Sequence, residues 1–154
     1  MCIRDRHIWV QNWGWYDPEK ANSNFEKAVN KAKKYIRHHA SIAKKLNKPL
    51  VLEEFGMARD GGSYASTATT KRRDAYFQSV FELLEQLQQE GYPISGSNVW
   101  AWGGEGRPRQ PKAVWKNGDD FIGDPPFEHQ GWYSIYHTDY STIEVLKKFA
   151  NKRD

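Results

Sequence analysis

The chain has 154 residues, which is enough for one ordinary domain, and its hydrophobic share of 38% and charged share of 27% are typical of globular proteins. Its net charge of +4 is mild, and its basic residues are spread along predicted helices, which argues against nucleic-acid binding. The single cysteine, Cys2, excludes an internal disulfide. No apolar run approaches the roughly 20 residues that a membrane span requires.

The first residues differ in character from those that follow. The stretch "MCIRDR" (1–6) is short and charged and lacks the apolar core of a secretory signal. The next stretch, "HIWVQNW", has the character of a strand end without the apolar strand that should precede it. We therefore expect residues 1–6 to be a foreign leader and residues 7–154 to be a domain fragment whose front part is missing.

A long amphipathic helix is predicted after an aromatic loop. Residues 7–17 run from strand to loop, and Asp17 followed by Pro18 is a typical helix start, with Asp as the cap. The main helix is predicted over 24–46, and Asn47 ends it. Its apolar stripe, spaced by alternating fours and threes, consists of Phe25, Val29, Ala32, Ile36, His39, Ala43 and Leu46.

Two strands and a second helix are predicted in the middle of the chain. The apolar start of residues 50–54 favours a strand, and residues 70–90 carry a second amphipathic stripe that Gly91 ends. A strand over 94–102 follows. Next comes an irregular run, 103–130, whose length is typical of loops that cover active sites.

The last predicted element is a helix near the end of the chain. Ser141 and Glu144 have the spacing of a capping box before an apolar stripe. The order along the chain is then strand, helix, strand, helix, strand, long loop and helix. This alternation predicts right-handed βαβ units and a parallel sheet, and therefore an α/β fold.

Polar and aromatic residues gather where the three predicted strands end, which is where α/β folds bind their ligands. These residues are His7 and Trp9, then Glu53 and Glu54, then Trp100 and Trp102. The chain is rich in aromatic residues, with seven Trp, and Trp faces stack on sugar rings. Glycosidic bonds are cut by pairs of carboxylates. Together these features predict carbohydrate chemistry.

The two consecutive acids raise a question of direction. Side chains alternate along a regular strand, so Glu53 and Glu54 are expected to point to opposite faces, and only one of them then faces the ligand site. Spacing alone does not select which.

Several motifs carry a resemblance to a known family. The stretch "PLVLEEFG" resembles the seventh strand of glycoside hydrolase family 5, and "HIW" with "NWGW" resembles the sixth-strand end of its β-mannanase branch. The stretch "GSNVWAWGGEGRP" resembles the eighth strand, and "DPPFEHQGWYSIYHTDYSTIEVLKKF" the closing segment. The resemblance implies the C-terminal part of a (β/α)8 TIM barrel, from about strand 6 to strand 8, with parallel strands.

The resemblance also implies roles for individual residues. Glu54 matches the nucleophile of a retaining glycoside hydrolase, because it directly precedes the aromatic residue and the glycine of E-F-G. His7 and Trp100 match residues that contact the sugar at the cleavage point. Trp9 occupies the position of a Tyr that hydrogen-bonds the nucleophile in many family members. The general acid/base matches no residue of this chain and is expected on an earlier strand. No cofactor or metal is implied.

Simpler explanations exist for each of these residues. Glu54 is alternatively a structural acid paired with an arginine such as Arg59, and His7 a capped core histidine. Trp102 is a further candidate for substrate binding. Trp13 is a candidate subsite wall, with local packing as the alternative. His39 is expected in the core, and no metal-ligand spacing is present.

The leading functional hypothesis is an endo-acting mannan 1,4-β-mannosidase with a β-mannan or a related oligosaccharide as its partner. The alternatives are another family 5 glycanase, such as a cellulase or an exo-β-mannosidase, and a carbohydrate-binding fragment that cuts nothing. We expect the full-length protein to be secreted, periplasmic or on the cell surface. The sequence predicts neither a nucleic-acid partner nor an oligomeric state.

Overall fold

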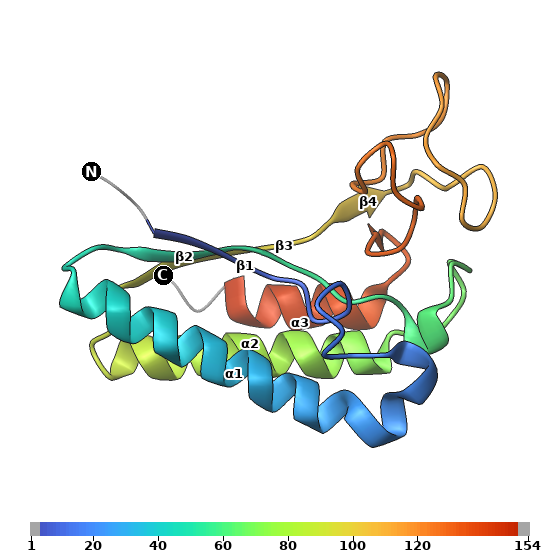
Figure 1. Ribbon diagram of the computed structural model, residues 1–154. Coiled ribbons are helices and arrows are strands. Elements are labelled where there is room, and N and C mark those ends of the chain that lie inside the picture. The colour runs from blue at the N-terminus through green and yellow to red at the C-terminus, as the bar shows by residue number, and fades with distance from the viewer. Residues whose placement is uncertain (1–3, 151–154) are drawn as a thin grey trace.

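The computed structural model describes residues 4–150, and its main feature is a parallel three-stranded sheet in the order β1-β2-β3. Figure 1 shows the helices on one face of this sheet, whereas no helix covers the other face. The elements in chain order are β1 (Arg4–Ile8), η1 (Pro18–Lys20), α1 (Ala21–Lys45), β2 (Leu50–Phe55), η2 (Asp60–Gly62), α2 (Lys71–Gln89), β3 (Ile94–Val99), β4 (Trp102–Gly104), β5 (Ile135–Tyr136) and α3 (Tyr140–Ala150).

The helices lie close to their predicted positions. The side chain of Asp17 accepts a hydrogen bond from the Glu19 backbone N–H at 3.0 Å, as a capping residue does, and the short helix η1 leads into α1. Asn47 has a left-handed φ of +49° just after α1, and Gly91 has a φ of +74° just after α2. Both residues therefore end their helices as the sequence predicts. None of the helices within residues 4–150 is long and apolar enough to cross a membrane.

Strand β1 starts earlier than the sequence indicated. Arg4 pairs with Leu50 and Arg6 pairs with Leu52, so residues 4–6 belong to the sheet. These residues fall within the stretch that we expected to be a foreign leader. The leader therefore stays a prediction about the origin of residues 1–6, while three of those residues have a structural place in the fold.

The predicted strand 94–102 is two separate strands. Strand β3 ends at Val99, and the backbone N–H of Trp100 donates to the carbonyl of Phe55 at 2.8 Å. The peptide bond between Trp100 and Ala101 is cis. The chain then leaves the main sheet, and Trp102–Gly104 forms β4, which pairs with β5 in a second, two-stranded sheet.

The core lies between the main sheet and the helices. Phe55 at the end of β2 is fully buried, and its ring contacts those of Tyr76, Phe77 and Phe81 of α2 at centroid distances of 6.3, 5.4 and 5.7 Å. Leu50 and Leu52 join the same cluster from the strand, and the apolar stripe of α1 joins it from the other helix. Burial of these side chains supplies the main driving force for docking the helices on the sheet.

A buried ion pair network ties the loops to α3. Asp139 Oδ2 accepts hydrogen bonds from Arg59 at 2.6 Å and from Arg73 at 2.7 Å, and all three side chains are almost fully buried. Burial lowers the pKa of Arg73, and the Asp139 carboxylate opposes this shift. The predicted capping box at Ser141 is wrong, because the Ser141 hydroxyl lies inside α3 and donates to Asp74 at 2.6 Å.

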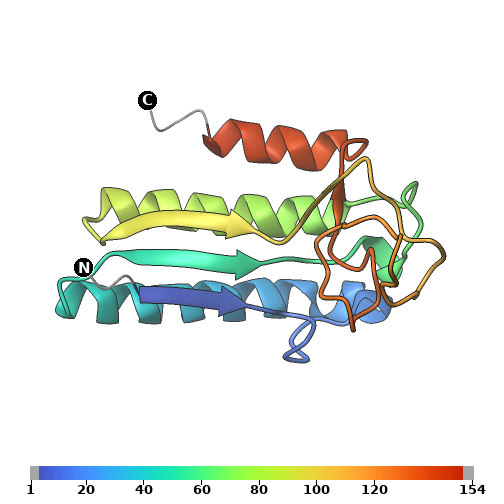
Figure 2. The same cartoon turned by 90° about the horizontal axis from the view of Figure 1, so that it is seen from above.

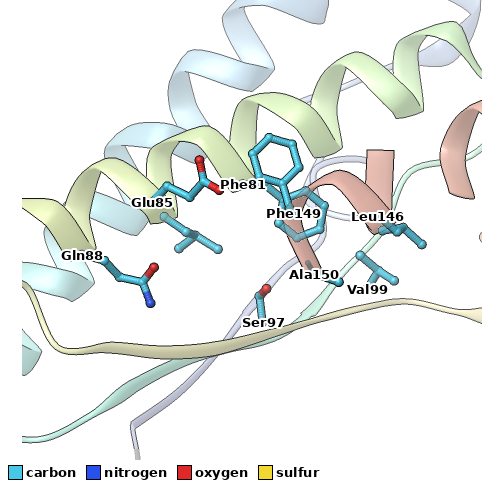
Figure 3. Close-up of a pocket in the computed structure, with 9 residues that line it drawn as sticks. Phe81, Glu85, Gln88, Ser97, Val99, Leu146, Phe149 and Ala150 are labelled. Carbon is cyan, nitrogen blue, oxygen red and sulfur yellow. The ribbon is translucent and has the colours of Figure 1, made fainter. Parts of the chain in front are cut away.

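An apolar cavity of about 420 Å³ lies between α2, α3 and β3. Figure 3 shows Phe81 and Phe149 beside each other, with Leu146 and Val99 close by. The rings of Phe81 and Phe149 stack at 5.1 Å. No residue of this cavity is one of the predicted catalytic or sugar-binding residues, so the candidate active site must be sought elsewhere.

We predict that Asp139→Asn destabilises the fold by about 3–5 kcal/mol, because two buried guanidinium groups then share no carboxylate. Urea unfolding followed by circular dichroism measures this change. Glu144→Gln is the control, because Glu144 forms an exposed ion pair with Lys147 that contributes little. Equal effects of the two substitutions would contradict the role given to Asp139.

Candidate active site

The carboxyl ends of all three parallel strands meet at one edge of the main sheet. Figure 2 shows the three arrows pointing the same way, towards the loops that connect β4 and β5. At this edge His7 Nδ1 lies 2.9 Å from Glu54 Oε2, and the two side chains are 46% and 27% exposed. The structure therefore brings the predicted nucleophile and the predicted histidine into direct contact at a place that solvent and ligands reach.

An extra residue in β2 explains how two consecutive acids fit at this edge. On β1, the neighbours Arg6 and His7 pair with Leu52 and Glu54, so one residue of β2 is skipped. On β3, Ser97 and Val99 pair with Leu52 and Phe55, and again β2 has one residue more than its neighbour. Such an insertion is a β-bulge, which locally breaks the alternation of side chains.

The bulge removes the regular alternation from which we expected Glu53 and Glu54 to point to opposite faces. Leu52 and Phe55 are three residues apart, yet both are buried in the core against the helices. Regular alternation would send these two to opposite faces. Because the bulge lies between them, Glu53 and Glu54 are both kept out of the core and both are half-buried. The contact with His7 distinguishes Glu54 from Glu53.

Arg59 does not pair with Glu54. Its guanidinium donates to Asp139 at 2.6 Å and to the Ala68 carbonyl at 3.1 Å, and its side chain is buried. The alternative that Glu54 is a structural acid held by Arg59 therefore does not agree with the structure.

Three aromatic rings cluster beside the strand ends. Trp9 contacts Trp100 edge-on at 5.9 Å and Tyr133 at 5.2 Å, and the Tyr133 hydroxyl donates to the Asn12 side chain. The described partner of the Glu54 carboxylate is His7, whereas Trp9 packs against other rings. Trp102 lies beyond this cluster on β4 and is 59% exposed.

Trp13 belongs to a different group of rings. Its centroid lies 5.0 Å from that of Trp15 and 5.5 Å from that of Tyr35 on α1, and it is 40% exposed. The structure therefore places Trp13 against α1 rather than in the cluster of Trp9, Trp100 and Tyr133. Its role as a subsite wall stays a prediction. His39 also lies beside Tyr35, and its Nδ1 accepts a hydrogen bond from Arg6 at 2.9 Å.

Gly56 has a physical reason to be glycine. A Cβ at this position would lie 2.6 Å from the Trp100 carbonyl oxygen and 3.2 Å from the Tyr133 ring. The end of β2 and the end of β3 thus approach each other more closely than any side chain permits. The glycine of E-F-G therefore allows Trp100 to lie beside the end of the strand that carries Glu54.

No sequence pattern indicates the roles of Tyr133 and Asp124. The Asp124 carboxylate accepts backbone N–H groups from Gly131 at 2.7 Å, Trp132 at 3.0 Å and Tyr133 at 3.3 Å. Burial raises the pKa of Asp124, and these hydrogen bonds oppose the rise. Asp124 thereby fixes the loop that presents Tyr133. Both residues lie in an irregular run where no periodicity marks them.

The residues near Glu54 do not form a metal site. Across residues 4–150, no three His, Cys, Asp or Glu side chains come together in a way that could hold an ion. The chemistry available from the described side chains is that of a carboxylate, an imidazole and flat aromatic faces.

A parallel sheet backed by helices, with a carboxylate at the carboxyl ends of its strands, is an arrangement that α/β-barrel enzymes contain. Residues 3–153 match the family model described as "GH family 5 beta-mannosidase-like". The chain therefore belongs to glycoside hydrolase family 5.

Solved structures show how much of such an enzyme this chain resembles. A family 5 mannosidase from Rhizomucor miehei is 36% identical with a TM-score of 0.87, and the match covers 97% of this chain and 37% of that one. An endo-1,4-β-D-mannanase from Thermotoga petrophila is 21% identical with a TM-score of 0.60, and the match covers 96% of this chain and 33% of that one. At this identity the match shows the fold alone. The predicted fold class is confirmed, because the described elements form part of a (β/α)8 barrel.

Curated relatives are also longer than this chain. A mannan endo-1,4-β-mannosidase 4 from Solanum lycopersicum is 31% identical over 75 residues, which cover 49% of this chain and 18% of that protein. A mannan endo-1,4-β-mannosidase 3 from Arabidopsis thaliana is 30% identical over 80 residues, 51% of this chain and 18% of that protein.

We predict that Gly56→Ala destabilises the fold by about 1–3 kcal/mol and displaces Trp100, because the new methyl group overlaps a backbone oxygen. Urea unfolding measures the first effect, and the tryptophan bands of the near-UV circular dichroism spectrum report the second. Gly96→Ala is the matched control, since its Cβ would meet Val51 at an ordinary 3.7 Å. An unchanged spectrum in Gly56→Ala would refute the close approach.

A second prediction concerns alkaline pH. Burial raises the pKa of Tyr133 above its usual value of 10.0. Below that pH the phenol is protonated in folded and unfolded chains alike, so its contribution to stability is fully present. Above it the unfolded chain loses the proton while the folded chain keeps it. The free energy of unfolding should therefore fall as pH rises above 10.

Tyr133→Phe isolates this contribution. The slope of unfolding free energy against pH should become less steep by about 1.4 kcal/mol per pH unit, the value for one proton. Denaturant unfolding between pH 9 and 11.5 measures the slope. If parent and variant have the same slope, Tyr133 is not the buried phenol that the structure shows.

Proposed function

We propose that this chain supplies the nucleophile half of a retaining glycoside hydrolase that cleaves β-1,4-mannosidic bonds in mannans, with Glu54 as the nucleophile. The observation that carries the proposal is the contact of 2.9 Å between Glu54 and His7 at the carboxyl edge of the parallel strands, beside the rings of Trp9 and Trp100. Its support comes from family 5 membership and from relatives named as mannan endo-1,4-β-mannosidases.

The reaction would proceed by double displacement. Glu54 attacks the anomeric carbon while a general acid protonates the departing glycosidic oxygen, which gives a covalent glycosyl-enzyme. The same acid/base then removes a proton from water, and the water releases the sugar from Glu54. His7 holds one oxygen of the carboxylate, which leaves the other oxygen to attack. Trp100 and Trp9 would provide flat faces for the sugar at the cleavage point.

The general acid/base would come from a segment outside these 154 residues. Retaining enzymes hold their two carboxyl groups roughly 5–5.5 Å apart, on either side of the scissile bond. The chain spans about a third of the length of the solved family 5 structures that it matches, which supports a missing partner. On this proposal the chain alone does not hydrolyse mannan. We also propose that the full-length protein is secreted, periplasmic or on the cell surface, because a polymeric glycan lies outside the cell.

Exo action is the second candidate. The solved Rhizomucor miehei enzyme is called a mannosidase, and a mutant of it, 36% identical to this chain, was solved in complex with mannosyl-fructose, a short saccharide. The long segment between β4 and β5 lies beside the carboxyl ends of the strands (Figure 1). On this proposal the segment would close one end of the substrate cleft. An endo enzyme instead needs a cleft that is open at both ends.

The experiment joins this chain to the preceding part of the Rhizomucor miehei mannosidase, which restores a whole barrel. We expect hydrolysis of mannan in preference to carboxymethylcellulose, and Glu54→Gln should lower kcat/KM by at least about a thousandfold. Glu53→Gln is the matched control and should retain most of the activity. Release of mannose alone, rather than of mixed oligosaccharides, would indicate exo action.

Two outcomes would contradict the proposal. Loss of activity in Glu53→Gln with activity kept in Glu54→Gln would show that the wrong acid was chosen. Mannan hydrolysis by the 154-residue chain alone, abolished by Glu54→Gln, would show that the chain contains its own acid/base.

A further inference from the structure

The positive charge of the chain is concentrated on a single helix. Helix α1 contains seven Lys and Arg residues and one acid, Glu26, which gives it a net charge of +6 in a chain of net charge +4. The neighbouring helix α2 has three basic and three acidic residues and is neutral. The imbalance is therefore a property of α1 and not of the helix layer as a whole.

Four of these lysines, together with His38, form one exposed row, which we call the basic stripe. Its members are spaced by four, three, four and seven residues, so they share one side of the helix, and they are Lys27, Lys31, Lys34, His38 and Lys45. The stripe lies opposite the core residues Ala32, Ile36 and Ala43, which face the sheet. Figure 1 shows α1 in the helix layer, on the side of the molecule away from the uncovered sheet face.

Two of the three basic residues of α1 outside the stripe contact polar groups at the end of α2. Arg37 binds Gln86 at 2.9 Å and lies 3.8 Å from Glu90, and Lys44 donates to the Glu90 carbonyl at 3.4 Å. Among the described residues, no acid forms an ion pair with a lysine of the stripe. Like charges three and four residues apart destabilise a helix, and solubility alone would be served by mixed charges. Apart from the contact of Lys31 with the Trp15 ring, the stripe thus weakens the helix without an evident structural benefit.

Aromatic rings border the stripe at one point, and one of them, Trp13, is exposed. Lys31 Nζ lies 4.4 Å from the centre of the Trp15 ring, and Trp15 contacts Trp13, which in turn contacts Tyr35. Trp13 is 40% exposed. Flat aromatic faces beside cations suit a polymer that carries both sugar rings and repeated negative charges. The stripe contains no arginine, the residue whose planar group best matches phosphate, which favours carboxylates over a phosphate backbone.

We propose that the basic stripe, together with Trp13, Trp15 and Tyr35, is a docking surface for an acidic polysaccharide of the polyuronate type. This surface runs along α1 and the loop that follows β1, and its rings pack against α1 instead of joining the cluster of Trp9, Trp100 and Tyr133. It would keep the protein on a charged matrix while the active site works on a neutral glycan. The inference stands independently of whether Glu54 cleaves mannan, because it concerns binding to a different polymer.

The test measures binding by biolayer interferometry at low salt, with the 154-residue chain and with the restored barrel. The probes are polygalacturonate, neutral galactomannan, duplex DNA and phosphatidylserine vesicles. The triple variant Lys27→Glu, Lys31→Glu, Lys34→Glu removes the stripe. The matched control Lys71→Glu, Lys147→Glu, Lys148→Glu changes exposed lysines of α2 and α3 and gives the same net charge.

We expect polygalacturonate to bind most tightly and to lose at least about tenfold in affinity in 0.5 M salt, because exposed charges are then screened. The stripe variant should lose at least about tenfold at low salt, and the control less than about twofold. Trp13→Ala should weaken polygalacturonate binding and leave DNA binding unchanged. Because the three substituted side chains are exposed and lie opposite the core, the stripe variant should keep the circular dichroism spectrum of the parent.

Three results would overturn the proposal. Equal loss in the two triple variants would show that only net charge matters. Tighter binding of DNA or of vesicles than of polygalacturonate would assign the surface to another class of partner. Absence of polygalacturonate binding by the folded chain and by the restored barrel would show that the stripe is only a solvated helix face.

Discussion

The arrangement at the strand ends depends on the close approach of two backbones at Gly56. The carbonyl of Trp100 and the ring of Tyr133 occupy the space where a Cβ would stand, so the ends of β2 and β3 pack closely together. The backbone N–H of Trp100 also donates a hydrogen bond to the carbonyl of Phe55. Trp9 then packs against both Trp100 and Tyr133, so the aromatic cluster beside Glu54 is a consequence of the missing side chain.

The buried ion pairs hold the loops in place. Arg59 follows β2 after a short loop, Arg73 lies near the start of α2, and both bind Asp139 at the start of α3. Buried ion pairs add little net stability, but a buried charge without its partner is very costly. The network therefore acts chiefly as a constraint, since the loops have few other arrangements that keep all three charges satisfied. The same Asp139 carboxylate also accepts the backbone N–H of Tyr136, which links β5 to this network.

Local patterns in the sequence predicted the helices and their ends. The stripe of α1, its start after Asp17 and its end at Asn47 all follow from periodicity and capping, which act within a few residues. The proximity of His7 and Glu54 could also be predicted, because parallel strands bring their carboxyl ends to one edge. The pair of Arg59 and Asp139 links residues 80 positions apart, and no period indicates such a partner. The end of β3 at Val99 could not be predicted, because the residues after it continue the apolar and aromatic character of a strand.

The paired acids at the end of β2 show why a motif can locate a site but not its geometry. From the sequence, alternation required that Glu53 and Glu54 face opposite ways, which would have buried one of them against the helices. The extra residue between Leu52 and Phe55 removes that requirement, because it lets both flanking apolar residues reach the core while both acids stay outside. A strand with regular alternation could offer only one acid to a ligand at this depth. The bulge keeps both acids outside the core, and the contact with His7 distinguishes the carboxylate of Glu54 from that of Glu53. The selection of Glu54 thus comes from its neighbour on β1, and the E-F-G motif marks the strand end where that selection is made.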